Sequence, residues 1–325
     1  MKTNLLPSKV TLISKLKRVL LNKGVQSQEI SVIGELNPLS FQTDFVHIEQ
    51  KLQNKVINGM FCELERYSEF VSVYVHGSWA DETNTPFSDI DDFIILDIES
   101  LKLNNQLNKV LKILNTIDMK FCRLDPIQHH GHWICSEEEL KTYTNSFIPI
   151  YILKDAKIIF GRTHITAKVN KYATLEGLEY NILNTCKSIE KLSVKYFNGT
   201  INSYQLKGLV GSFVLMPAFI FQIQDIYLSK PQAILKSNEI YSDEALKCIT
   251  WSTNNRNNWD AVITDYRFRI FKRLTNLFLN PHLWRKFSNK FSPRITMEQN
   301  KKLSHVELTP IMVEKFIKES LKYAK

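Results

Sequence analysis

Residues 73–96 read VYVHGSWADETNTPFSDIDDFIIL, and this stretch decides how the chain of 325 residues is interpreted. Its two apolar runs are rich in β-branched residues and predict strands over 71–76 and 91–96. Between the two runs lie a Gly-Ser pair and then three acids, Asp89, Asp91 and Asp92. Carboxylates this close repel one another, so the pattern predicts a compensating cation near the start of the second strand.

The Gly-Ser pair and the acids have complementary chemistry. Gly77 permits a tight turn and a close approach of the backbone, and Ser78 adds a hydroxyl and an N–H at an expected helix start, which suits phosphate oxygens. Residues two apart on a strand point the same way, so Asp89 and Asp91 are expected to face one side. Mg²⁺ takes oxygen ligands and bridges carboxylates to phosphates, so it is the expected cation.

The motif HGSWADETNTPFSDID resembles the signature of the DNA polymerase beta-like nucleotidyltransferase superfamily, in particular the stand-alone bacterial type that includes kanamycin nucleotidyltransferase and the minimal nucleotidyltransferases. The resemblance implies that Gly77 and Ser78 hold the β- and γ-phosphates of an NTP, expected to be ATP, and that Asp89 and Asp91 bind two Mg²⁺ ions. We expect Asp92 to face outward and not to be a ligand. The resemblance is closest over 71–96 and extends to about residue 160.

The resemblance also implies a third carboxylate on a later strand, where it helps to activate the acceptor hydroxyl. Alternating residues predict a third strand over 118–127. It contains Asp118 and Asp125, which are seven residues apart and would face opposite sides of an unbroken strand. We favour Asp125 as the catalytic and metal-binding residue, because it lies deeper in the strand and beside a polar cluster. Asp118 is the alternative.

Three histidines follow Asp125, at positions 129, 130 and 132, with Cys135 nearby. A zinc site would need a second ligand cluster at a usual spacing, and the sequence offers none. A polar strand end or loop is the simpler interpretation. A third interpretation is that His129, His130 and His132 line the acceptor pocket or assist proton transfer.

The order of the expected elements predicts an α+β fold, with a mixed β-sheet and flanking helices followed by an all-helical C-terminal domain. Helices are expected over 8–22, 47–66 and 99–115, and two short strands within 147–160. After about residue 170 only helices are expected, over 173–197, 204–225, 230–237, 243–251, 257–279 and 310–323. The predicted domains are 1–165, a nucleotidyltransferase catalytic domain with N-terminal helices, and 166–325, a helical substrate-binding domain.

The composition of the chain limits the class of protein and the cellular compartment that it fits. The chain is 44% hydrophobic and 23% charged, as is usual for a soluble globular protein, and its content of only 10 Gly and 10 Pro excludes collagen-like and linker-rich classes. Five cysteines without a CxxC pair predict a reducing compartment and a cytoplasmic location. The apolar run near 209–223 contains Ser212 and Pro217 and is short for a membrane span, so we expect a buried, Pro-bent helix and no membrane partner.

The net charge of +9 is concentrated in residues 265–302, which hold ten Lys or Arg and two acids. This basic segment interleaves aromatic residues, which fits a weak nucleic-acid contact. It also fits an amphipathic helix whose apolar residues belong to the core, and we favour that structural interpretation.

The expected function is Mg²⁺-dependent transfer of an NMP from an NTP to a hydroxyl, with release of pyrophosphate. The acceptor is either a small molecule such as an aminoglycoside or an RNA or protein. One alternative is a non-catalytic nucleotide- or nucleic-acid-binding protein on the same fold, which the presence of both Asp89 and Asp91 disfavours. Another is a toxin or defence-system nucleotidyltransferase held by a partner.

Overall fold

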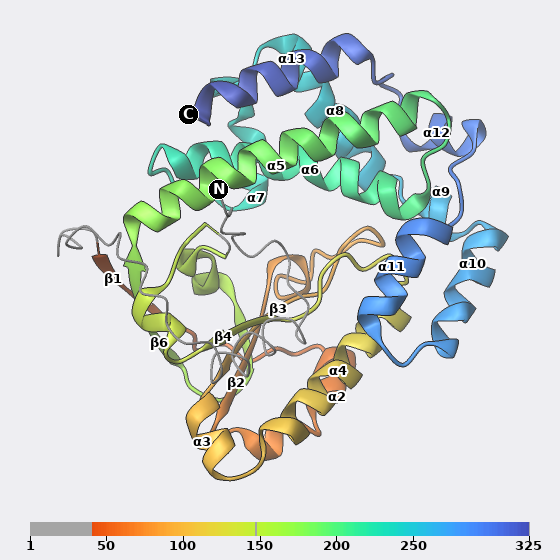
Figure 1. Ribbon diagram of the computed structural model, residues 1–325. Helices are drawn as coiled ribbons and strands as arrows, with labels where there is room; N and C mark the ends of the chain where they lie inside the picture. Colours follow the sequence, from red (N-terminus) through yellow and green to blue (C-terminus); the bar gives the residue numbers. More distant parts are fainter. Residues whose placement is uncertain (1–40, 147, 325) are drawn as a thin grey trace, which may run out of the picture. The chain divides into compact units, whose positions relative to one another are not determined.

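A computed structural model describes residues 41–146 and 148–324 of the chain (Figure 1). It contains two compact units whose segments alternate along the sequence. Unit 1 takes the described part of Met1–Ala80, then Ile90–Lys120 and His130–Thr174. Unit 2 takes Asp81–Asp89, Phe121–His129 and the described part of Leu175–Lys325. The helix predicted over 8–22 lies outside the described residues.

Unit 1 is built on a four-stranded sheet with the strand order β4-β3-β2-β5. The central strand β2 (Val71–His76) is antiparallel to both β3 (Asp91–Leu96) and β5 (Lys157–Phe160), while β3 is parallel to β4 (Trp133–Ser136). Five of the six residues of β2 are buried, as expected of a strand covered on both faces. The mixed sheet and the strands over 71–76 and 91–96 are confirmed.

A second sheet in unit 1 was not predicted. Strand β1 (Phe41–His47) pairs antiparallel with β6 (His164–Asn170). β6 alternates between exposed and buried residues along most of its length, the pattern of a strand with one solvated face. The pairing joins segments more than a hundred residues apart, so no local pattern in the sequence indicates it.

The helices of unit 1 differ in length and position from those predicted. Helix α2 (Lys55–Phe61) begins at Asn54, whose side chain accepts hydrogen bonds from two backbone N–H groups of the first turn, so residues before Asn54 are not helical. The helix expected over 99–115 is two helices, α3 (Ile98–Leu103) and α4 (Leu107–Leu124). Asn105 separates them with a φ of 55°. One-turn 3₁₀ helices complete the set at η2 (Glu65–Tyr67), η3 (Gly77–Trp79) and η4 (Glu139–Thr142).

The strand predicted over 118–127 is wrong, because helix α4 continues to Leu124. The residues Val110, Leu114, Ile117 and Phe121 are all buried and follow the spacing of one helix face. The alternation of Met119 and Phe121 is only a short section of this longer helical pattern.

Only one of the two strands predicted within 147–160 is present. The first segment is a 3₁₀ helix, η5 (Ile150–Asp155), and the second is β5. Gly161 follows β5 with a φ of 101°, and a Cβ at this position would lie 2.4 Å from the Ser72 hydroxyl. The end of β5 therefore packs against β2 at a distance that only glycine permits.

The described residues of unit 2 beyond 175 are helical, as predicted for the second half of the chain (Figure 1). Helix α5 begins in unit 1, and Gly199, with a φ of 64°, follows its end. Two predicted details differ: the helix expected over 257–279 is interrupted, and two later helices were not expected. The elements are α5 (Lys171–Phe197), α6 (Ser203–Ile223), α7 (Lys230–Leu235), η6 (Ser237–Glu239), α8 (Asp243–Asn257), α9 (Asp260–Ile263), α10 (Tyr266–Arg273), η7 (Leu274–Leu277), α11 (Pro281–Phe291), α12 (Met297–Leu303), α13 (Pro310–Ser320) and η8 (Leu321–Tyr323).

Helix α6 is the core helix of unit 2. Among the described residues it is the one helix long and apolar enough to cross a membrane by length and composition, and 61% of its most apolar window is buried inside the protein. It contains Pro217 and packs against α7 and α8. We therefore interpret α6 as the buried, Pro-containing helix that the sequence predicts.

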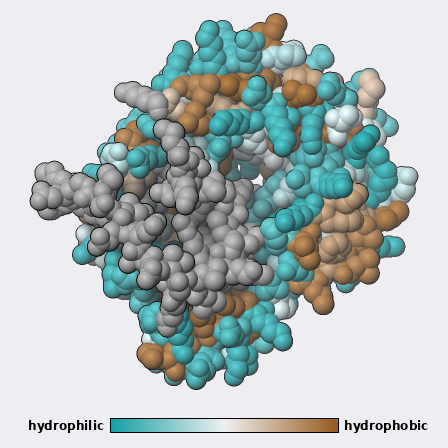
Figure 2. Space-filling view, viewed as in Figure 1, coloured by the Kyte–Doolittle hydropathy of each residue, from teal (hydrophilic) through white to brown (hydrophobic). Residues whose placement is uncertain are grey.

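The surface of unit 2 is less uniformly polar at α10 and α11. Figure 2 shows a hydrophobic area over these two helices, bordered by hydrophilic residues. Large apolar side chains that are more than half exposed there are Ile270, Leu277, Leu279, Leu283 and Phe291.

Candidate active site

The Gly-Ser corner of unit 1 lies directly beside a carboxylate. Gly77 follows β2 with a φ of 68°, a left-handed conformation that favours glycine. Across the sheet His76 pairs with Asp91, and a Cβ built on Gly77 would lie 3.7 Å from Asp91 Oδ2. Ser78 is half-buried in the 3₁₀ turn that follows. Unit 1 therefore brings together three of the predicted site residues, Gly77, Ser78 and Asp91.

Asp92 faces the interior of unit 1, which corrects the expectation that it points outward. It is 1% exposed. Its carboxylate forms a hydrogen bond with Nδ1 of His132 and accepts the Trp133 N–H at 3.3 Å. The physical reason is that residues 92–96 of β3 are all buried, so both faces of this strand are covered. Asp92 thus links the N-terminal end of β3 to the start of β4 by hydrogen bonds.

His132 is a buried partner of Asp92 rather than a residue of an open pocket. Its Nε2 lies 2.8 Å from the Leu114 carbonyl oxygen, so both ring nitrogens face oxygen acceptors and the ring fits as an imidazolium. Burial lowers the pKa of His132, but the charge and hydrogen bond of Asp92, the charge of Asp118 and the Leu114 carbonyl raise it above its usual value. Asp118, on α4, is buried and belongs to this electrostatic neighbourhood.

Unit 2 holds Asp89 and Asp125 together through a lysine. Lys207, on α6, donates hydrogen bonds to Asp89 Oδ1 at 2.6 Å and to Asp125 Oδ2 at 2.5 Å. The side chain of Lys207 is 2% exposed, and those of Asp89 and Asp125 are 13% and 15% exposed. Lys207 was not among the residues predicted from the sequence. The available signal was a single lysine close to the apolar run of a core helix, because lysine is almost never fully buried unless it is paired.

The charged groups of this cluster shift one another's pKa values. Burial lowers the pKa of Lys207, but Asp125 and Asp89 raise it above its usual range, so the ammonium stays charged. Burial also raises the pKa of Asp125, with a contribution from Asp89, and Lys207 opposes this rise. A carboxylate with a raised pKa is a better proton acceptor than an ordinary aspartate.

The loop after α4 fixes the orientation of Asp125. Its Oδ1 accepts the Ile127 N–H at 3.1 Å, which forms a tight turn that ends the helix. Nε2 of His129 lies 3.0 Å from the Tyr204 carbonyl oxygen, and its Nδ1 lies 3.8 Å from Asp89 Oδ2. Of the three histidines, His129 is therefore the one that reaches the cluster within unit 2.

Residues 57–197 match the family model of the nucleotidyltransferase domain. The chain contains a nucleotidyltransferase domain. This agrees with the DNA polymerase beta-like superfamily that the motif resembles, and the match includes Gly77, Ser78, the three aspartates and Asp125. Comparisons with curated proteins and with solved structures found no significant match.

The carboxylates of the nucleotidyltransferase domain differ in how well they suit a metal ion. No group of three or more His, Cys, Asp or Glu side chains within 41–146 and 148–324 is arranged to hold a metal. Asp89 and Asp91 are two residues apart, so their Cα atoms are at most about 7 Å apart, and each offers the hard oxygen atoms that Mg²⁺ prefers. The Lys207 ammonium contacts Asp89 Oδ1 at 2.6 Å, and the assignment of Asp89 and Asp91 as metal ligands stays a prediction.

Asp125 shares the Lys207 ammonium with Asp89 and also accepts a backbone N–H. The Lys207 ammonium contacts one of its oxygens and the Ile127 N–H contacts the other. A positive charge thus already lies beside Asp125, where the sequence predicts a second metal ion. The assignment of Asp125 as a metal ligand stays a prediction.

Proposed function

We propose that this protein is a Mg²⁺-dependent nucleotidyltransferase that moves an NMP, expected to be AMP from ATP, to a hydroxyl acceptor. The matched nucleotidyltransferase domain supports NMP transfer as the general activity. The observation that carries the finer proposal is the position of Asp91, whose carboxylate lies beside the exposed Gly77 corner of unit 1. A phosphate-binding turn next to a metal-binding carboxylate is what transfer from an NTP requires.

The proposed roles follow from the chemistry of each side chain. Gly77 and Ser78 bind the β- and γ-phosphates, and Asp89 and Asp91 hold the metal. Mg²⁺ supplies neutralising charge for the triphosphate and for the pyrophosphate that leaves. Two metal ions were expected from the sequence. In this proposal the Lys207 ammonium, and not a second ion, neutralises the charge of Asp125.

The reaction forms one bond and breaks one. The acceptor oxygen bonds to the α-phosphorus of the NTP, and the bond from that phosphorus to the bridging oxygen of the β-phosphate breaks, which releases pyrophosphate. Asp125 takes the proton of the acceptor hydroxyl, a role favoured by its raised pKa. Lys207 holds the Asp125 carboxylate in a fixed orientation by its hydrogen bond.

The setting of this activity is part of the proposal. All five cysteines are free, which supports a reducing compartment and the cytoplasmic location expected from the sequence. The acceptor is taken to be a small molecule, an RNA or a protein, each of which offers a hydroxyl.

The proposal is tested with the four NTPs, each labelled at the α-phosphate, and a panel of RNA, protein and aminoglycoside acceptors. Pyrophosphate release and labelled product are measured for the wild-type protein, for Asp91→Asn and for Asp155→Asn. Asp155 is exposed and lies outside the motif, so its substitution controls for the loss of one carboxylate. Transfer should disappear in Asp91→Asn and persist in the control. Undiminished transfer in Asp91→Asn would rule out the assignment.

A further inference from the structure

The loop that carries Asp125 is held from both ends by basic side chains of unit 2. Lys272, on α10, donates to the Leu124 carbonyl oxygen at 2.9 Å, just before Asp125. Arg285, on α11, donates from Nε to the Gln128 carbonyl oxygen at 3.3 Å, at the far end of the loop. The loop that carries the proposed acceptor-activating residue is therefore hydrogen-bonded to two cations, one on each side of Asp125 in the sequence.

Helix α11 also fixes the middle of the same loop. The Pro126 carbonyl oxygen accepts hydrogen bonds from the Trp284 indole N–H at 2.8 Å and from the Ser288 hydroxyl at 3.0 Å. Trp284 and Ser288 are both fully buried. Since all of these contacts lie within unit 2, α10, α11 and the Asp125 loop form one packed substructure.

The Lys and Arg side chains of this substructure are not balanced by acids, and they lie alongside its exposed apolar residues. Residues 266–294 contain eight Lys or Arg and no Asp or Glu. Arg269, Lys272 and Arg273 are spaced i, i+3 and i+4, so they share one face of α10, and all three are exposed. We call these three residues the basic face. Because Lys272 itself contacts the loop, the basic face borders Asp125.

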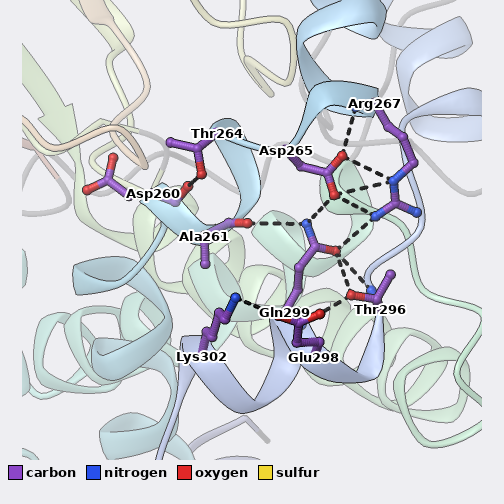
Figure 3. A network of polar contacts seen from close by, with 9 residues as sticks. All are labelled: Asp260, Ala261, Thr264, Asp265, Arg267, Thr296, Glu298, Gln299 and Lys302. Atoms are coloured by element: carbon purple, nitrogen blue, oxygen red, sulfur yellow. Dashed lines mark hydrogen bonds and ion pairs between the residues drawn. The ribbon is translucent and has the colours of Figure 1, made fainter.

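Not every cation of the segment is available to a ligand. Arg267 forms a bidentate pair with Asp265, and Gln299 links Asp265 to the Ala261 carbonyl oxygen (Figure 3). This network joins the start of α10 to α12, so the charge of Arg267 has a structural partner. The basic face lies beyond this network, further along α10.

We propose that the acceptor is an RNA whose 3′-terminal ribose hydroxyl reaches Asp125 while its upstream phosphates lie on the basic face. The inference rests on the proposed nucleotidyl transfer and specifies its acceptor. A polycationic aminoglycoside would be repelled by this surface, whereas a polyanion gains affinity by releasing counterions. Tyr266, three residues before Arg269 on α10, is 66% exposed, and Phe291 is 55% exposed, with its ring centroid 5.1 Å from the Lys290 ammonium; bases can stack on such aromatic faces.

The step is balanced for this acceptor. The terminal ribose oxygen forms the new bond to the α-phosphorus of the NTP, pyrophosphate leaves, and the hydroxyl proton passes to Asp125. The product is an RNA extended by one nucleotide through a phosphodiester bond. A 3′-phosphate on the RNA removes the reacting hydroxyl and should block transfer without removing the charge that binds the basic face.

Binding is tested by fluorescence anisotropy with a short, 5′-labelled, single-stranded RNA. The double variant Arg269→Glu with Arg273→Glu is compared with Lys315→Glu and Lys318→Glu, a matched change at two exposed lysines of α13. Wild type and control should lose affinity as salt rises from about 50 to about 200 mM. The basic-face variant should bind at least about tenfold more weakly, with a salt slope smaller by about 1.4, or about 0.7 for each lost phosphate contact.

The neutral pair Arg269→Gln with Arg273→Gln keeps this test decisive if the glutamate variant fails to fold. It should shift affinity in the same direction by a smaller factor. Equal affinity of the basic-face variants and the α13 control, or a flat salt response, would overturn the inference.

A transfer assay distinguishes failure of this inference from failure of the proposed function. With α-labelled NTP, label should enter RNA that ends in a 3′-hydroxyl and not the same RNA with a 3′-phosphate, and the basic-face variants should raise the KM for RNA. Label on an aminoglycoside or a protein but not on RNA would overturn the acceptor and leave nucleotidyl transfer standing. Absence of transfer to every acceptor, together with no Mg²⁺-dependent binding of a non-hydrolysable ATP analogue, would contradict the proposed function itself.

Discussion

The ammonium of Lys207 lies 2.5 Å from Asp125 Oδ2, and 2% of the lysine side chain is exposed. The same ammonium contacts Asp89, so a core helix of unit 2 supplies the charge that allows two acids from distant parts of the sequence to lie together. A buried ion pair costs desolvation energy and is weak evidence of a stability role. Because Lys207 pairs with two predicted site residues, we infer that these ion pairs have a functional role.

Removal of this lysine should destabilise the protein strongly. Lys207→Met leaves Asp89 and Asp125 buried without their cation, and loss of one partner of a buried pair costs about 3–5 kcal/mol. The free energy of unfolding from urea titration measures the loss. Lys187→Met, at an exposed position of α5, should stay within about 0.5 kcal/mol of wild type. Equal stability of the two variants would contradict this view of the cluster.

The two candidates for the third carboxylate can be separated by kinetics. Asp125→Asn removes the proposed proton acceptor and should lower kcat by about 10²–10⁴-fold, with little change in the KM for NTP. Asp118→Asn alters a residue beside His132 and should affect thermal stability more than kcat. Steady-state rates of pyrophosphate release decide the matter. The reverse result would identify Asp118 as the catalytic residue.

The His132–Asp92 pair should make unfolding depend on pH. The folded-state pKa of His132 lies above the unfolded value, which is about 6.5. The pair therefore contributes its full stability below about pH 6.5 and loses it as pH rises through the folded-state pKa. Urea titrations from acid to alkaline pH should show this decline in wild type and not in His132→Gln. His305→Gln, at an exposed position, should retain the wild-type profile. Parallel profiles for wild type and His132→Gln would exclude the imidazolium.

Any side chain at Gly77 should lower both the stability of the fold and the affinity for NTP. Gly77→Ala places a Cβ on a residue with a φ of 68° and should destabilise the fold by about 1–2 kcal/mol. It should also weaken binding of a non-hydrolysable NTP analogue, because relief of the backbone strain would move the corner that lies beside Asp91. Gly59→Ala is the control, since this position in α2 is helical and has open space for a Cβ. It should stabilise by about 0.5–1 kcal/mol, and a matching effect at Gly77 would show that the turn is not constrained.

The sequence by itself determined the parts of the protein that depend on short-range pattern. Strands β2 and β3 agree with residues 71–76 and 91–96, because alternating β-branched residues specify a strand locally. The start of the helix predicted over 310–323 also agrees with α13, where the Thr309 hydroxyl accepts the Met312 N–H at 3.3 Å as an N-terminal cap. The Gly-Ser and Asp-x-Asp spacing pointed to the nucleotidyltransferase domain that residues 57–197 match.

The tertiary structure alone decided which distant residues meet. The end of α4 reads as a strand over a few residues and becomes helix because the longer pattern buries one face. The pairing of β1 with β6, the inward position of Asp92 and the ion pairs of Lys207 each join segments far apart in the chain. The physical reason is that a buried charge is stable only beside its partner, and that partner is chosen by folding rather than by proximity in the sequence.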